Sequence, residues 1–205
     1  MAKKPELIKA VFGVVNPAVR HVADRLFVLT GSREGVEDRK PRIDKFFETG
    51  LVVAIFEYLL MLPSLAHLEI CHEKPYPKKT RPEQVDIWIR SLRGGTDILI
   101  EAGDFTPGKL KDDAAKMRRL NPNGQNWFLA FFRDQPAAGQ TDAPSQDPRK
   151  KLKDCRSRKG SLKGCHLALE PIDEQEGNLL IGSFTVELPG QPKIHFGYAI
   201  IRVWP

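Results

Sequence analysis

The chain has 205 residues, with 32 Lys and Arg against 26 Asp and Glu, so its formal net charge is +6. This length suits a single domain, residues 1–205, that buries a substantial core. The chain is therefore basic, and its modest excess of Lys and Arg is a weak indication of a polyanionic partner.

The cysteines and the apolar runs indicate a cytoplasmic setting. Cys71, Cys155 and Cys165 form no CxxC pair, which argues against a disulfide framework. The N-terminal residues lack the apolar segment of a secretory signal. The longest apolar run, residues 50–62, is interrupted by Glu57 and is shorter than the roughly 20 residues needed to span a membrane. We therefore expect a cytoplasmic protein with no membrane partner.

Two helices are predicted before the first strand. Residues 5–29 have a helical apolar stripe that Pro17 breaks. The stripe consists of Leu7, Val11, Val14, Val15, Val19 and Val22. After a polar loop, residues 43–62 predict a second helix that is apolar on nearly all sides from Gly50 onward, which is typical of a buried helix. Glu57 lies in that apolar half, so it either pairs with a basic residue or belongs to a site.

Strands dominate the middle of the chain. Residues 65–72 predict a first strand, and residues 85–91 and 97–102 predict a hairpin around a Gly-Gly turn. A helix follows, with Thr106 as its N-cap and Pro107 at its first position.

Residues 127–132 are apolar throughout, which is typical of a central strand covered on both faces. The order of elements predicts an α/β (α+β) protein with a mixed central sheet flanked by helices, its third and fourth strands joined by a right-handed helical crossover. Residues 165–205 predict extra C-terminal strands, which either extend that sheet or form a second one.

The hairpin carries two carboxylates among apolar neighbours, Asp86 on one strand and Glu101 on the next. Such a pair is costly unless a positive charge lies between its members, and Mg²⁺ is the simplest candidate. The alternative is that each acid pairs with a Lys or Arg near the surface.

These residues resemble the core of the PD-(D/E)xK nuclease-like superfamily, which has the restriction-endonuclease-like fold. Asp86 matches the Asp that opens one strand of the motif, and Glu101 matches the acid near the end of the next strand. The position of the family's Lys, two residues after that acid, holds Gly103. With the preceding helix and the following strand, the resemblance covers about residues 42–133.

The resemblance implies a metal-dependent nuclease that hydrolyses phosphodiester bonds in nucleic acid, with DNA favoured as the substrate. Asp86, Glu101 and the backbone carbonyl of Ala102 would hold Mg²⁺ or Mn²⁺. Glu57 would complete the site directly or through water, because nucleases of this class often place an acid from that helix beside the strand carboxylates.

Gly103 leaves two hypotheses open. In the first, a lysine of the following helix replaces the missing one: Lys109, the first choice, Lys111 in the same turn, or Lys116 on the same face as Lys109. Gly103→Lys would then maintain or raise activity. Asp104 could also serve as a displaced acid. In the second, the site is eroded, and the chain is a nucleic-acid-binding module that does not cleave.

Two basic segments suggest where nucleic acid would bind, because Lys and Arg side chains neutralise phosphates. The first lies between the first two strands, and the second follows a Pro- and Ala-rich stretch in a flexible loop over residues 135–163. Their candidate contacts are Lys78, Lys79, Arg81, Arg149, Lys150, Lys151, Arg158 and Lys159. The alternatives are solvated charged loops, or an interaction protein whose basic loops bind an acidic protein partner.

Overall fold

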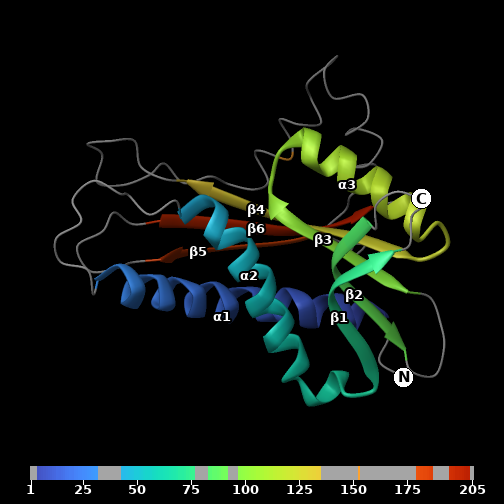
Figure 1. The fold of residues 1–205 in the computed structure, drawn as a ribbon, viewed down its shortest axis with the longest axis horizontal. Helices are drawn as coiled ribbons and strands as arrows, with labels where there is room; N and C mark the ends of the chain where they lie inside the picture. The colour runs from blue at the N-terminus through green and yellow to red at the C-terminus, as the bar shows by residue number, and fades with distance from the viewer. Residues whose placement is uncertain are drawn as a thin grey trace.

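The protein, described here from a computed structural model, is built on a six-stranded mixed sheet with helices on both faces (Figure 1). The structure describes residues 4–31, 43–76, 83–91, 97–134, 152, 179–186 and 194–203. The expected mixed central sheet flanked by helices is therefore confirmed.

The helices and strands follow one another in an order close to the expected one. They are α1 (Lys4–Gly31), α2 (Ile43–Leu60), the short 3-10 helix η1 (Pro63–Leu65), β1 (Leu68–Tyr76), β2 (Glu83–Ser91), β3 (Ile98–Asp104), α3 (Pro107–Leu120), β4 (Gln125–Asp134), β5 (Leu179–Val186) and β6 (Ile194–Val203).

The strands are arranged in the order β1-β2-β3-β4-β6-β5. β3 and β4 run parallel and are joined through α3, whereas every other neighbouring pair is antiparallel. The two C-terminal strands extend the main sheet, because β6 pairs with β4 and β5 pairs with β6. Residues 165–178, where further strand structure was expected, lie outside the described residues.

The sheet separates two apolar layers. α1 and α2 cover one face, and α3 covers the other (Figure 1). The side chains of β3 alternate between the layers: Ile98 and Ile100 pack on the side of α1 and α2, and Leu99 packs on the side of α3. This alternation places every second residue of β3 next to α3, including Glu101.

α1 passes through Pro17 without a break, contrary to the interruption expected from the sequence. Pro17 is exposed, so water can satisfy the carbonyl group that the proline leaves without a backbone donor. The whole predicted stripe, on both sides of the proline, is buried: Leu7, Val11, Val14, Val15, Val19 and Val22.

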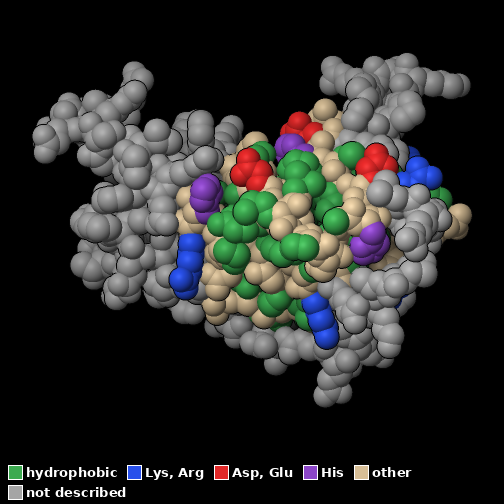
Figure 2. All heavy atoms as spheres, turned by 90° about the horizontal axis from the view of Figure 1, so that it is seen from below, with side chains coloured by type: hydrophobic (Ala, Val, Ile, Leu, Met, Phe, Trp, Pro, Cys, Tyr) green, Lys and Arg blue, Asp and Glu red, His purple; other side chains and the backbone are tan. Residues whose placement is uncertain are grey.

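The helices that the structure describes are all too short or too polar to cross a membrane. Figure 2 shows the molecule from below, where hydrophobic side chains gather near the middle and charged side chains are scattered around them. Among the described residues, the large hydrophobic side chains left exposed are Leu60 and Met61, at the end of α2. The described part of this face carries no concentrated group of Lys and Arg.

Candidate active site

Asp86 and Glu101 lie on neighbouring strands, next to the point where the pairing of those strands stops. The paired register of β2 and β3 ends at Ile87↔Ile100, so the next two residues along, Asp86 and Glu101, would be opposite each other. Beyond that point the Ala102 N–H donates to a side chain of β2 and not to its backbone: the acceptor is Asp86 Oδ2, at 2.7 Å. The predicted proximity of the two carboxylates is confirmed, since each acts electrostatically on the other.

The two carboxyl groups are poorly stabilised as anions. Glu101 is only 3 % exposed. Burial, followed by the charge of Asp86, raises the pKa of Glu101 to about 8, against the opposing effect of Lys116. Burial also raises the pKa of Asp86, although the hydrogen bond from Ala102 works in the other direction. Without a further cation, the pair therefore tends to keep a proton at neutral pH instead of carrying two negative charges side by side.

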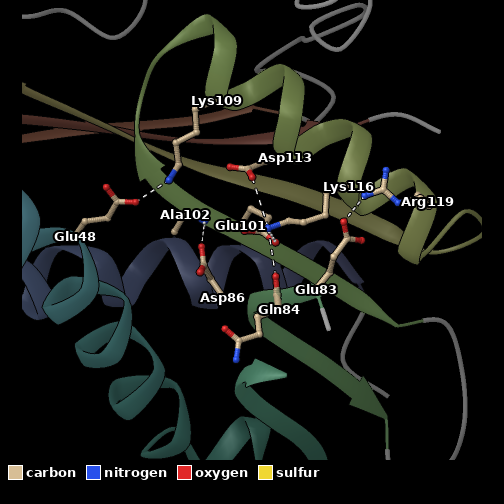
Figure 3. Close-up of polar contacts among 10 residues, drawn as sticks. All are labelled: Glu48, Glu83, Gln84, Asp86, Glu101, Ala102, Lys109, Asp113, Lys116 and Arg119. Atoms are coloured by element: carbon tan, nitrogen blue, oxygen red, sulfur yellow. Dashed lines mark hydrogen bonds and ion pairs between the residues drawn. The ribbon is translucent and has the colours of Figure 1, made fainter. Parts of the chain in front are cut away.

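α3 supplies a lysine to this pair (Figure 3). Lys116 Nζ lies 2.6 Å from Glu101 Oε1 and 3.6 Å from Asp113 Oδ1, and it donates to the backbone carbonyl oxygen of Gln84 at 3.2 Å. Asp113 was not predicted from the sequence. Its position, four residues after Lys109 and three before Lys116, places all three on one helix face and could have identified it.

A second lysine of α3 lies over Gly103, at the other end of this cluster. Lys109 Nζ donates to Glu48 Oε1 at 2.7 Å, so the ion pair joins α3 to α2 (Figure 3). A Cβ at residue 103 would collide with Cε and Nζ of Lys109 and would lie 2.6 Å from Glu48 Oε1. The ammonium group of Lys109 thus occupies the space that a side chain at position 103 would need.

The local sequence explains how Lys109 is held there. Thr106 caps α3, and its Oγ1 accepts the Lys109 N–H at 3.1 Å, which fixes the first turn of the helix. Gly103 adopts a φ of 156°, which side-chain-bearing residues rarely adopt. A side chain at position 103 would have to move the ends of the Lys109 and Glu48 side chains and adopt this backbone, so the expectation that Gly103→Lys would maintain activity stays a prediction.

The prediction that Glu57 points at the strand carboxylates is also wrong. Its side chain is exposed, whereas Glu48, nine residues earlier on α2, reaches the site. Nine residues are about two and a half turns and roughly 13 Å of rise, so the two side chains leave opposite faces of α2. A helical wheel could have identified Glu48, which precedes the buried Leu51 and Val52 by three and four positions.

The donor groups around Asp86 suit a hard divalent cation. The described residues contain no group of three or more His, Cys, Asp or Glu side chains arranged to hold a metal ion. Asp86 and Glu101 nevertheless supply two carboxylates, and the Ala102 carbonyl faces β2 as its N–H does, because both groups of a strand residue point to the same neighbour. Oxygen ligands with excess negative charge fit Mg²⁺ or Mn²⁺.

The basic residues predicted to bind nucleic acid, at positions 78, 79, 81, 149–151, 158 and 159, lie outside the described residues. Among the described residues, the site is formed by α2, α3 and the parts of β2 and β3 beyond their pairing. No protein-family model, curated protein or solved structure matches this chain.

Proposed function

We propose that this protein is a metal-dependent nuclease of the PD-(D/E)xK type in which the lysine comes from a helix. The observation that carries the proposal is the position of Lys109, whose ammonium group lies over Gly103, two residues from Glu101 along β3. Asp86, Glu101 and Lys109 are the three residue types of the motif that the sequence resembles. The missing lysine is replaced in space although it is absent from its usual place in the sequence.

Asp86, Glu101 and the Ala102 carbonyl would hold Mg²⁺ or Mn²⁺. When bound, the ion would lower the pKa of a water molecule and stabilise negative charge on the phosphate oxygens. The chain's own contribution is to bring both carboxylates to the point where the pairing of β2 with β3 ends. The β3–β4 pairing continues past them to Asp104↔Phe131, so the backbone that carries Glu101 is fixed on that side.

Lys109 would act as a fixed positive charge and hydrogen-bond donor. Burial works to lower its pKa, but the hydrogen bond to Glu48 and the charges of nearby carboxylates outweigh burial and raise the pKa. The side chain therefore stays an ammonium at neutral pH and is unsuited to abstract a proton. Held by Glu48, it can donate to a phosphate oxygen or orient the attacking water.

A non-cleaving nucleic-acid-binding module is the second candidate. The observation that favours it is the ion pair between Lys116 and Glu101, in which an internal ammonium already lies on a proposed metal ligand. A site in which that lysine had permanently replaced the metal would keep the fold and lose the reaction.

Incubation with plasmid DNA, single-stranded DNA and RNA, with and without Mg²⁺ or Mn²⁺, separates the two candidates. We expect the wild type to cleave only with the metal and Asp86→Asn to lose cleavage. Asp97→Asn is the matched control: Asp97 precedes the other end of β3, where it accepts from Trp88 Nε1 at 2.9 Å, and it should retain cleavage. No cleavage of any substrate with either metal would reject the nuclease and favour the binding module.

A further inference from the structure

Lys116 is unusual among the residues of the site because its ammonium group lies on Glu101, one of the proposed metal ligands. Its Nζ is 2.6 Å from Glu101 Oε1, and its charge also acts on Asp86 and Asp113. It is further held by the Gln84 carbonyl oxygen. Two carboxylates and a carbonyl oxygen around one cation form a ligand set of the kind that hard metal ions use.

The charges of the site favour a divalent cation over this single ammonium. Lys109 forms its ion pair with Glu48, next to Gly103. Asp86, Glu101 and Asp113 all act on Lys116, whereas Lys109 acts on Asp86 and Asp113 from its ion pair with Glu48. Four carboxyl groups, including Glu48, therefore face two ammonium groups in this cluster. Asp113 Oδ2 is buried, and no group among the described residues donates a hydrogen bond to it.

We propose that Lys116 is an exchangeable cation that a divalent metal ion displaces from Glu101 when the site is loaded. This inference rests on the proposed function, since the incoming ion is the metal of the nuclease reaction. A metal ion on Glu101 would lie within a few ångströms of the Lys116 ammonium, and the repulsion between the two cations favours departure of the lysine. Lys116 thereby sets the metal concentration at which the site fills.

After displacement from Glu101, Lys116 has another carboxylate within reach of its ammonium group. Its side chain is 22 % exposed, and Asp113 lies three residues earlier on the same helix, within ion-pair distance already. A rotation of the flexible side chain would exchange Glu101 for Asp113 and water without moving α3.

Calorimetric titration with Mn²⁺ tests the exchange directly. Lys116→Met keeps the length of the side chain and removes its charge, so it should bind Mn²⁺ roughly tenfold more tightly than the wild type, as expected from removing one charged contact. Arg119→Met is the matched control, because Arg119 pairs with Glu83 one turn along α3 and not with Glu101. Its affinity for Mn²⁺ should equal that of the wild type.

Lys116→Gln serves as a second neutral variant in case Lys116→Met does not fold, and it should also bind Mn²⁺ more tightly. Affinities of the neutral variants equal to or below that of the wild type would overturn the inference. Asp86→Asn is titrated with Mn²⁺ in the same way. If it abolishes Mn²⁺ binding while the neutral Lys116 variants bind no more tightly than the wild type, the proposed metal site stands and the exchange is rejected. Absence of Mn²⁺ binding by the wild type and every variant would overturn both.

Discussion

Both halves of β3 lie between β2 and β4, but the first half is apolar and the second carries the polar residues of the site. In the first half, Ile98, Leu99 and Ile100 pair with β2 and bury apolar side chains in both layers. In the second half, the pairing with β2 stops, and Glu101 and Gly103 lie beneath the lysines of α3. One half holds the sheet together, and the other holds the site.

The pairing of β3 with β4 explains why both can occur in one strand. That pairing continues from Ile98↔Gln125 to Asp104↔Phe131 through both halves. The site half is therefore fixed on the β4 side, while on the β2 side its backbone groups are available to Asp86 and to a ligand. A strand that is fixed along one edge and open along the other holds its polar groups in place and leaves them accessible to a ligand.

The largest effect is expected from filling the space over Gly103. Gly103→Ala should displace Lys109 or Glu48 and force a strained backbone, which we expect to cost about 1–3 kcal/mol of stability and to lower cleavage on the order of a hundredfold. Denaturant unfolding and cleavage rates measure the two effects. Gly108→Ala is the control, because a Cβ there meets nothing within 4 Å. Equal effects of both substitutions would show that Lys109 is not held over Gly103.

The site half of β3 should also make the stability of the protein depend on pH. The pKa of Glu101 is raised from 4.5 to about 8 in the folded protein, so the folded state binds more protons than the unfolded state between these values. Without metal, stability should fall as pH rises through this window and level off above it, by an amount on the order of a few kcal/mol. Glu101→Gln should flatten the dependence in denaturant unfolding at several pH values. An unchanged slope would place the titrating group elsewhere.

The smallest effects compare the two glutamates of α2. Glu48→Gln removes the charge that holds Lys109, so cleavage should fall by roughly tenfold. Glu57→Gln alters an exposed side chain and should change stability by less than about 0.5 kcal/mol, with no change in rate. Cleavage rates of the two variants, measured in parallel, show which glutamate contributes to the site. A larger loss of rate in Glu57→Gln than in Glu48→Gln would assign Glu57 to the site.

The sequence predicted the sheet because hydrophobic periodicity and turn residues are local signals. The hairpin, the cap at Thr106 and the central strand at residues 127–132 all appear where their local patterns place them. The acid of α2 was assigned to the wrong residue, since an apolar run around Glu57 looks buried until the helix face is known.

The contact between Glu48 and Lys109 joins residues 61 positions apart. No local pattern encodes such a contact, because it depends on how α2 and α3 approach Gly103 from different sides. The same holds for the loss of pairing beyond Ile87↔Ile100, which depends on the side chain of Asp86 replacing a strand partner.

In the proposed nuclease, Lys109 does the work of the lysine missing at position 103. The most direct test is single-turnover cleavage by Lys109→Met at saturating Mn²⁺, with DNA affinity measured separately in Ca²⁺. We expect a loss of cleavage rate on the order of a hundredfold with DNA affinity nearly unchanged, because an oriented charge acts mainly in the transition state. A wild-type cleavage rate in Lys109→Met would contradict this role of Lys109.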